Sequence, residues 1–166
     1  MIRVLIVDDE IKLGKLLGES LTSQGHVVER CSLGRAAVER VGQTTFDLVL
    51  TDLRMPDLDG LSVLREVRQR SPQTDVVVMT AYGSVELAVE AMRLGACDYL
   101  TKPFALDELR IRVQRIAERR RVAGRAKQLE RELSAQNGFK SLVASSARMR
   151  AILEEARQVA RTDATV

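Results

Sequence analysis

The sequence predicts an α/β fold in which five parallel strands are covered by helices on both faces. Short apolar runs rich in Val, Ile and Leu alternate with amphipathic helical segments throughout the first hundred residues. Several of these runs, such as VLIV and VVVM, are apolar without interruption, as expected for strands that are buried on both faces. Strands and helices that alternate in this way form βαβ units with right-handed crossovers.

The expected strands follow one another at regular intervals. They cover residues 2–8, 26–31, 46–52, 74–81 and 98–103. The second run, HVVERC, mixes apolar and polar residues and therefore suits an edge of the sheet. Five strands with this spacing favour a flavodoxin-like order, in which ligands bind beyond the carboxyl ends of the strands.

Four amphipathic segments separate these strands. They cover residues 10–25, 34–43, 59–71 and 84–96. Their apolar residues recur at spacings of three or four, as Leu61, Leu64 and Val67 do, and this period is typical of a helix with one buried face. Gly25 and Gly95 supply stop signals at the ends of two of these helices.

A long helix is expected from about Ala105 to the AQNG sequence at 135–138. Its first apolar stripe can pack on the sheet and consists of Leu106, Leu109, Val113 and Ile116. A second stripe, out of phase with the first, consists of Val122, Ala126, Leu129 and Leu133. The second stripe has no sheet left to cover, so it favours a two-stranded coiled coil and a homodimer over a merely solvated helix. The basic run Arg119–Arg121 is interpreted as a solvated face of this helix.

Composition limits the possible functions. No stretch of the 166 residues approaches the length of an apolar membrane span, and the N-terminus has no signal-peptide pattern. Residues 105–166 contain 14 Lys and Arg against 8 Asp and Glu, whereas residues 1–104 contain 12 against 15. The basic part has one aromatic residue, no zinc-ligand spacing and no helix-turn-helix pattern, so no nucleic-acid binding or membrane binding is expected. The two cysteines lie far apart and are expected to be reduced thiols of a cytoplasmic protein.

Polar residues gather where the expected strands end. The first strand leads to Asp8 and Asp9, the third ends at Asp52, the fourth ends at Thr80, and Lys102 ends the fifth. In the flavodoxin-like order these four strands are neighbours, so their five side chains can face one shallow pocket. Singly, each residue has an ordinary structural explanation, but all five at one edge indicate a functional site.

The residues at this edge suggest a particular chemistry. Three carboxylates close together repel one another and raise their own pKa values unless a cation compensates. Carboxylates with waters and a carbonyl suit octahedral Mg²⁺. Held beside this ion, the Asp52 carboxylate can attack a phosphoryl group in line, while Lys102 and Thr80 stabilise the phosphoryl oxygens. No general base is needed because the attacking group is already ionised.

Four segments together carry a family resemblance. VLIVDDE, DLVLTDLRMPDLDGL, VVVMTAYGS and DYLTKPF resemble the receiver domains of two-component response regulators, which have a CheY-like fold. The resemblance covers residues 1–118. It implies that Asp52 accepts a phosphoryl group from a sensor histidine kinase and that the domain is a phosphoacceptor in signal transduction, with only self-catalysed phosphotransfer and dephosphorylation.

The same resemblance assigns further roles. It makes Asp8, Asp9, Asp52 and the backbone carbonyl of Arg54 the magnesium site. It makes Thr80 and Tyr99 a switch pair, and the Lys102–Pro103 peptide cis. Arg54 and Tyr82 are the positions that set the lifetime of the phosphoryl group.

The last segment resembles a second family. FKSLVASSARMRAILEEARQVARTDATV is similar to the start of the AAA+ ATPase domain in NtrC-type, sigma-54-dependent transcriptional activators, yet no G-x-x-x-x-G-K-[ST] motif is present. The expected organisation is a receiver domain at 1–118, a helical linker at 119–137 and the start of an incomplete ATPase domain at 138–166. This resemblance implies that the receiver and linker dimer controls ATPase assembly, and thereby sigma-54 RNA polymerase. The partner kinase, the signal and the promoters are not encoded in any motif.

Other functions remain open from the residues alone. A stand-alone receiver acting through protein contacts would use the same chemistry. An aspartate-nucleophile phosphatase would have a second acid two residues after the nucleophile, where this chain has Arg54. A flavin-binding module of this topology would have a phosphate-binding loop after the first strand, where this chain has DDEIK.

Overall fold

The structure is a computed structural model that describes residues 1–81, 85–137 and 152. By its internal contacts the chain divides into two compact units, Met1–Arg120 and Arg121–Val166. The first unit contains the sheet and the helical segments that cover it, including the first part of the last helix, and it carries the candidate functional site.

Two sequence predictions concern residues outside the described part of the chain. Tyr82, predicted to tune the phosphoryl lifetime, is one of them. Apart from residue 152, the predicted start of an ATPase domain at 138–166 also lies outside the described residues.

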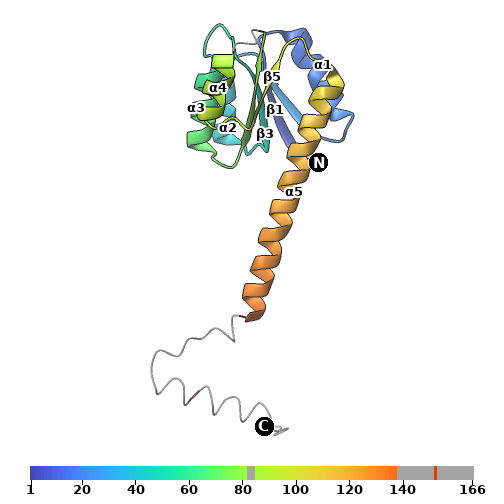
Figure 1. Cartoon of the computed structure of the whole chain (residues 1–166), viewed down its shortest axis with the longest axis vertical. Helices are drawn as coiled ribbons and strands as arrows, with labels where there is room; N and C mark the ends of the chain where they lie inside the picture. Colours follow the sequence, from blue (N-terminus) through green and yellow to red (C-terminus); the bar gives the residue numbers. More distant parts are fainter. Residues whose placement is uncertain (82–84, 138–151, 153–166) are drawn as a thin grey trace. The chain divides into compact units, whose positions relative to one another are not determined.

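Five strands form one parallel sheet in the order β2-β1-β3-β4-β5, as predicted (Figure 1). The strands are β1 Arg3–Val7, β2 Val27–Cys31, β3 Leu48–Asp52, β4 Asp75–Thr80 and β5 Asp98–Thr101. β1, β3 and β4 occupy the centre and are almost entirely apolar, whereas the more polar β2 lies at an edge. The flavodoxin-like fold class read from the sequence is therefore confirmed.

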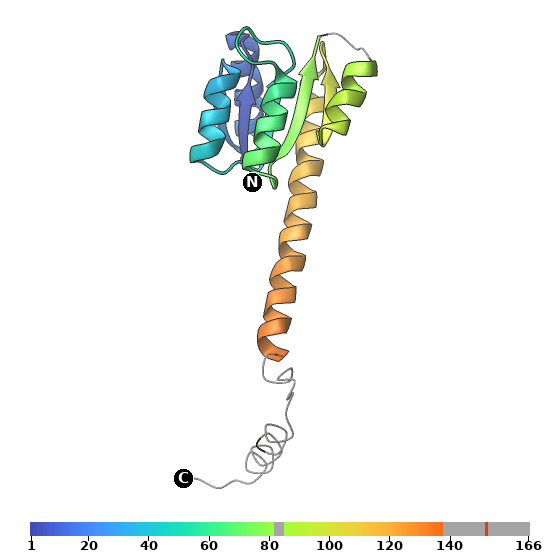
Figure 2. The ribbon, with the colours of Figure 1, turned by 90° about the vertical axis from the view of Figure 1, so that its left-hand side faces the viewer.

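Helices cover both faces of this sheet (Figures 1 and 2). They are α1 Ile11–Thr22, α2 Gly34–Gln43, α3 Gly60–Arg70, α4 Val85–Arg93 and α5 Leu106–Asn137. α1 and the first part of α5 pack on one face, and α2, α3 and α4 pack on the other. Gly25 and Gly95, which follow α1 and α4, both have positive φ values of 83° and 94°, a conformation that favours glycine.

The alternation of side chains along each strand divides the core into two layers. Val4 and Ile6 of β1 point toward α1 and α5, while Leu5 and Val7 point toward α2 and α3. All four side chains are fully buried. Burying one such side chain stabilises the fold by about 1.5–3 kcal/mol, so both faces of the sheet contribute to stability.

The two apolar stripes of α5 have different environments. Leu109, Val113 and Ile116 are buried against the sheet, and Leu106 packs beside them, as predicted for the first stripe. Residues 121–134 are exposed. In the second stripe, Val122, Leu129 and Leu133 have exposed fractions of 56%, 57% and 58%. The helix thus carries an uncovered apolar row after its last buried residue.

The interpretation of the basic run Arg119–Arg121 as a solvated face is wrong for Arg120, whose side chain is 26% exposed, whereas Arg119 and Arg121 are exposed. Arg119 forms an ion pair with Asp75, and Arg120 forms ion pairs with Asp47 and Asp75. These partners stand at the starts of β3 and β4, which the sequence pattern did not place near the end of the receiver part of α5.

Among the described residues, no helix has the length and hydropathy needed to cross a membrane.

Candidate functional site

The carboxyl ends of four adjacent strands bring the predicted polar residues to one edge of the sheet. Asp8 follows β1, Asp52 ends β3, Thr80 ends β4, and Lys102 follows β5. The parallel register β1-β3-β4-β5 places these ends side by side. The buried apolar residues of β1, β3 and β4 hold the polar ends in place, since these strands cannot shift without exposing apolar side chains.

Three carboxylates converge at this edge. Asp8, Asp9 and Asp52 each offer an oxygen, and these three oxygens lie within 4.8 Å of one another. The Asp8 side chain is fully buried and the Asp52 side chain is 13% exposed, whereas Asp9 is exposed. The cluster therefore opens to solvent on the side of Asp9.

Lys102 provides positive charge next to two of these acids. Its Nζ lies 2.8 Å from Asp8 Oδ2 and 3.0 Å from Asp52 Oδ2. Burial alone would lower the pKa of Lys102, but hydrogen bonds to Asp8 and Asp52 outweigh this effect and raise it. The lysine is therefore a fixed cation at neutral pH.

Burial raises the pKa of the Asp52 carboxyl group above its usual value, and the charge of Asp8 adds to the increase. The hydrogen bond and charge of Lys102, and the hydrogen bond from the Leu53 amide, oppose it. Lys102 contacts two of the three carboxylates, so a further cation would reduce the repulsion among them.

Backbone amides fix the orientation of the two inner acids. Asp8 Oδ1 accepts a hydrogen bond of 2.9 Å from the Glu10 amide, and Asp52 Oδ1 accepts one of 2.8 Å from the Leu53 amide. In both residues the other oxygen, Oδ2, contacts Lys102. The Lys102 amide donates to the Thr80 carbonyl at 2.6 Å, which joins the ends of β4 and β5.

Gly60, at the start of α3, explains how the chain passes close behind Asp52. A Cβ atom at this position would lie 2.3 Å from the Asp52 carbonyl oxygen and 2.9 Å from Leu53 Cα. The Gly60 amide donates to the Leu53 carbonyl at 2.9 Å. Only glycine fits this approach, so the loop after β3 is held tightly beneath the acidic cluster.

The other predicted site residues lie on β4, on β5 and in the loops that follow β3 and β5. Thr80 is buried at 4% exposure, and Tyr99 of β5 is partly buried. The Lys102–Pro103 peptide bond is cis. Arg54 is exposed in the loop that follows Asp52.

Sequence reasoning did not assign roles to the two remaining acids of the LRMPDLDG segment. The Asp57 carboxylate accepts hydrogen bonds from the amides of Gly34 and Arg35, at 3.0 and 2.9 Å, and so caps the start of α2. Asp59 caps α3 by accepting from the Ser62 amide at 2.7 Å. The Asp59-x-x-Ser62 spacing before an apolar run could have identified the second cap, since Asp is a preferred N-cap residue. No local sequence pattern identifies Asp57 as the cap of α2, because the amides that it accepts from are 23 and 22 residues away along the chain.

The donor set fits a hard divalent cation. Carboxylate oxygens are the ligands that Mg²⁺ prefers, and Mg²⁺ usually keeps several waters, which the open side near Asp9 allows. The cluster Asp8, Asp9 and Asp52 therefore has suitable donors, spacing and charge.

This sheet order, with an acidic cluster at the carboxyl ends of the strands and an adjacent lysine, defines a receiver-type α/β domain. The model of the response regulator receiver domain matches residues 4–114, and the chain belongs to this family. The sequence-based recognition of a receiver domain is therefore confirmed.

Curated relatives support the NtrC-type assignment made from the sequence. The chain is 37% identical to the regulatory protein AtoC of Escherichia coli. The alignment spans 164 residues, which are 99% of this chain and 36% of AtoC. It is 38% identical to the transcriptional regulatory protein ZraR of Klebsiella oxytoca, over 98% of this chain and 36% of ZraR. The chain thus spans about a third of the length of the curated relatives it matches.

Solved structures agree with this family. A Francisella response regulator receiver domain is similar with a TM-score of 0.68 and 33% identity, covering 72% of this chain and 98% of that domain. The NtrX protein from Brucella abortus has a TM-score of 0.66 and 30% identity, covering 97% of this chain and 34% of NtrX.

Proposed function

We propose that this chain is the phosphoacceptor part of an NtrC-type response regulator and that Asp52 receives the phosphoryl group. The observation that carries the proposal is the position of the Asp52 carboxylate. Its Oδ2 atom lies 3.0 Å from Lys102 Nζ, and one of its oxygens lies within 4.8 Å of a carboxylate oxygen of Asp8 and of Asp9. Phosphorylation-dependent regulation is the function of the family to which the chain belongs.

In this proposal the magnesium ion is held by Asp8, Asp9, Asp52 and the Arg54 carbonyl. When bound, it supplies positive charge beside the phosphoryl oxygens. The Asp52 oxygen forms the new bond to phosphorus, and the bond between phosphorus and the donor group breaks in line with it. Lys102 then neutralises one phosphoryl oxygen, and the Thr80 hydroxyl donates to another. Movement of Thr80 and Tyr99 would report the new state, while Arg54 and Tyr82 would set its lifetime.

A sensor histidine kinase is the proposed donor, and the cytoplasm the proposed compartment. An apolar pocket of about 450 Å³ lies next to Lys102 and is lined by Glu10, Leu13, Ala81, Lys102, Pro103 and Phe104. On the neighbouring α1, Ile11 is 73% exposed and Leu16 is 48% exposed. These apolar side chains beside the reacting carboxylate suit a protein donor, since a small phosphate ester would need no such surface.

The phosphoacceptor proposal is tested with a small-molecule donor. The chain is incubated with Mg²⁺ and acetyl phosphate, and intact-mass spectrometry measures the phosphorylated fraction. We expect a single phosphorylation that requires Mg²⁺ and is absent in Asp52→Asn. Asp57→Asn is the matched control, because this nearby carboxylate caps α2 and should not affect labelling. Equal labelling of Asp52→Asn would overturn the proposal.

We also propose that the 119–137 linker pairs as a homodimeric coiled coil and that this dimer controls an ATPase domain that acts on sigma-54 RNA polymerase. The exposed row Val122, Leu129 and Leu133, with Ala126 between them, supports the pairing. In this proposal the receiver and linker themselves have no ATPase activity.

The linker proposal is tested by sedimentation equilibrium with and without Mg²⁺ and beryllofluoride. We expect a dimer whose association constant changes when the phosphoryl mimic binds. Leu129→Glu should give a monomer, whereas Gln128→Glu on another side of the helix should not. A monomeric wild-type chain in both conditions would overturn the linker proposal and leave the phosphoacceptor proposal intact.

A further inference from the structure

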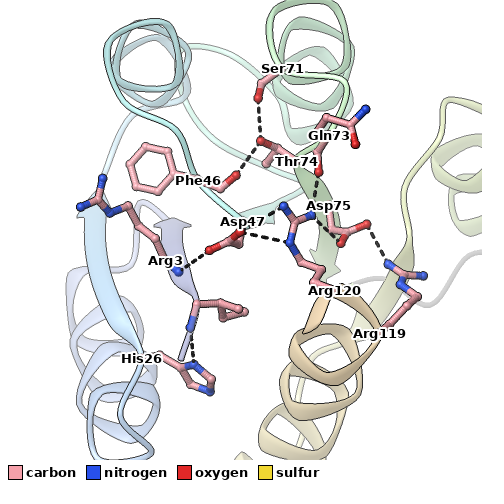
Figure 3. A network of polar contacts seen from close by, with 11 residues as sticks. Arg3, His26, Phe46, Asp47, Ser71, Gln73, Thr74, Asp75, Arg119 and Arg120 are labelled. Atoms are coloured by element: carbon pink, nitrogen blue, oxygen red, sulfur yellow. Dashed lines mark hydrogen bonds and ion pairs between the residues drawn. The ribbon is translucent and has the colours of Figure 1, made fainter. Parts of the chain in front are cut away.

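The edge of the sheet opposite the acidic cluster holds a second charged network (Figure 3). Arg120 Nε lies 3.1 Å from Asp47 Oδ1, and Arg120 Nη1 lies 3.1 Å from Asp75 Oδ2. Arg120 Nη1 also donates to the Gln73 carbonyl at 2.6 Å. Arg119 Nη2 donates to the other Asp75 oxygen at 2.7 Å. One turn of α5 is thus attached to the starts of two strands.

The acidic side of this network is rigid. Asp47 Oδ2 accepts a hydrogen bond of 2.8 Å from the Arg3 amide, and the Asp47 amide donates to the Arg3 carbonyl at 2.8 Å. The Asp75 amide donates to the Asp47 carbonyl at 3.0 Å. Both acids stand at the starts of β3 and β4, whose following residues are buried. If the contact opens, the helix must be the part that moves.

The helical side of the network has no apolar anchor of its own. The buried stripe of α5 ends at Ile116, and only Ala117 continues it, partly buried. From residue 121 to 134 the helix is exposed. The last turn in the first unit is therefore held mainly by the ion pairs of Arg119 and Arg120. Arg120 and Asp75 are partly buried, with exposed fractions of 26% and 18%, whereas Arg119 and Asp47 are more exposed, at 59% and 37%, so salt can screen these pairs.

We propose that Arg119 and Arg120, with Asp47 and Asp75, form an ionic latch that closes this turn of α5 over Cys97 and can open while the sheet stays folded. Segments with few buried apolar contacts open locally at a lower cost than the core. When the latch opens, the turn of α5 that carries Arg119 and Arg120 is released from the sheet, and the free part of the helix then begins just after Ile116. Arg120 thus acts as a positioning residue for the part of α5 that leads into the linker. This inference does not depend on the chemistry proposed for Asp52.

Cys97 lies where it can report the opening. Together with Asp98, Arg112, Arg115, Ile116 and Arg119, it lines a pocket of about 440 Å³. Its thiol is partly buried against the core layer that contains α5, and burial raises the pKa of Cys97 to about 11. The chain has one other cysteine, Cys31, which packs on the opposite face of the sheet and is removed in the test below.

The test measures the rate at which Ellman's reagent labels Cys97 under native conditions, in chains whose other thiol is removed by Cys31→Ser. We expect Arg120→Gln to raise this rate at least fivefold. We expect Asp47→Asn, which breaks the latch from the strand side, to raise it similarly. Sodium chloride at about 1 M should accelerate Cys97 labelling in the parent chain, whose latch is intact, and should have little further effect in Arg120→Gln.

Arg115→Gln is the matched control. Arg115 is an exposed arginine of the same helix that lines the same pocket, and in the described part of the chain it has no ion pair. Its removal should leave the rate within twofold of the parent. The reagent is an anion, so loss of an arginine disfavours its approach, and a rise in Arg120→Gln cannot come from that electrostatic change.

Two results would overturn the latch. One is an unchanged Cys97 rate in both Arg120→Gln and Asp47→Asn. The other is a Cys97 labelling rate that rises with urea as steeply as the global unfolding equilibrium does, because this would mean that Cys97 becomes accessible only when the whole domain unfolds.

Discussion

At the carboxyl ends of the strands (the carboxyl edge) three carboxylates lie together and one lysine contacts two of them, whereas at the amino ends (the amino edge) two carboxylates share two arginines. In the first cluster the acids outnumber the lysine that contacts them, and burial raises the pKa of Asp52 there. The second is balanced, with both oxygens of Asp75 occupied by arginine. The two edges belong to the same strands, since β3 and β4 contribute to both. The comparison indicates that the edge proposed to be reactive holds more carboxylates than contacting cations, whereas the charges of the other edge are matched.

The largest effect is expected from removing the lysine of the carboxyl edge. Lys102→Met leaves the fully buried Asp8 without its cation, and breaking a buried pair costs about 3 kcal/mol of unfolding free energy. Urea unfolding measures this loss, and Mg²⁺ should restore part of it. Lys15→Met, which removes an exposed pair with Glu19, should cost less than about 0.5 kcal/mol. Equal losses in the two variants would mean that the carboxyl edge is not short of positive charge.

A second substitution at the carboxyl edge tests the close approach behind Asp52. Gly60→Ala places a methyl group against the Asp52 carbonyl, and overpacking of this kind costs about 2 kcal/mol. Beryllofluoride should also bind more weakly, because the carboxylate is displaced. Gly14→Ala is the matched control, since no atom lies within 4 Å of the added methyl group. In the helix α1 it should stabilise the fold by about 0.5–1 kcal/mol. A fully stable Gly60→Ala chain would contradict this account of the loop.

A smaller effect is expected at the balanced edge. Arg120→Gln should lower the free energy of unfolding by about 1 kcal/mol, because its pairs are partly exposed and screened. Urea titrations at low and high salt should show the difference from the parent shrinking as salt increases. Arg115→Gln should show neither the loss nor the salt dependence. If Arg120→Gln lowered the free energy of unfolding as much as Lys102→Met does, the two edges would not differ in the energetic importance of their ion pairs.

The smallest effect concerns His26, which is buried near the amino edge and accepts a long hydrogen bond of 3.4 Å from the Ile2 amide (Figure 3). Burial, and then the charged N-terminus, lower its pKa. The unfolded chain therefore binds the proton more strongly, and stability falls as the pH drops through about 6.5. His26→Asn should flatten the stability profile between about pH 7 and 5.5, by less than about 1 kcal/mol. An unchanged slope in urea titrations at these pH values would contradict the prediction.

The main features of the fold and the carboxyl edge could be predicted from the sequence. Apolar strand runs alternate with helical stripes, so the parallel sheet and its order followed from general rules of connection. Asp8, Asp52 and Lys102 stand at strand ends, and parallel strands bring their carboxyl ends to one edge by necessity. The positions of these residues along the chain were therefore sufficient to group them.

The positions of the acids and the lysine along the chain were enough to predict the contacts at the carboxyl edge, whereas the contacts at the amino edge depend on how α5 packs in three dimensions. Arg119 and Asp75 are 44 residues apart, and Arg120 and Asp47 are 73 apart. Their meeting depends on the angular position at which α5 crosses the sheet, which is fixed by the packing of Leu109, Val113 and Ile116. A basic run on a helix has the same local pattern whether it faces water or two aspartates. Whether the arginines face water or the two aspartates is decided by the packing of the apolar stripe, because this packing sets the directions of all the remaining side chains on the helix.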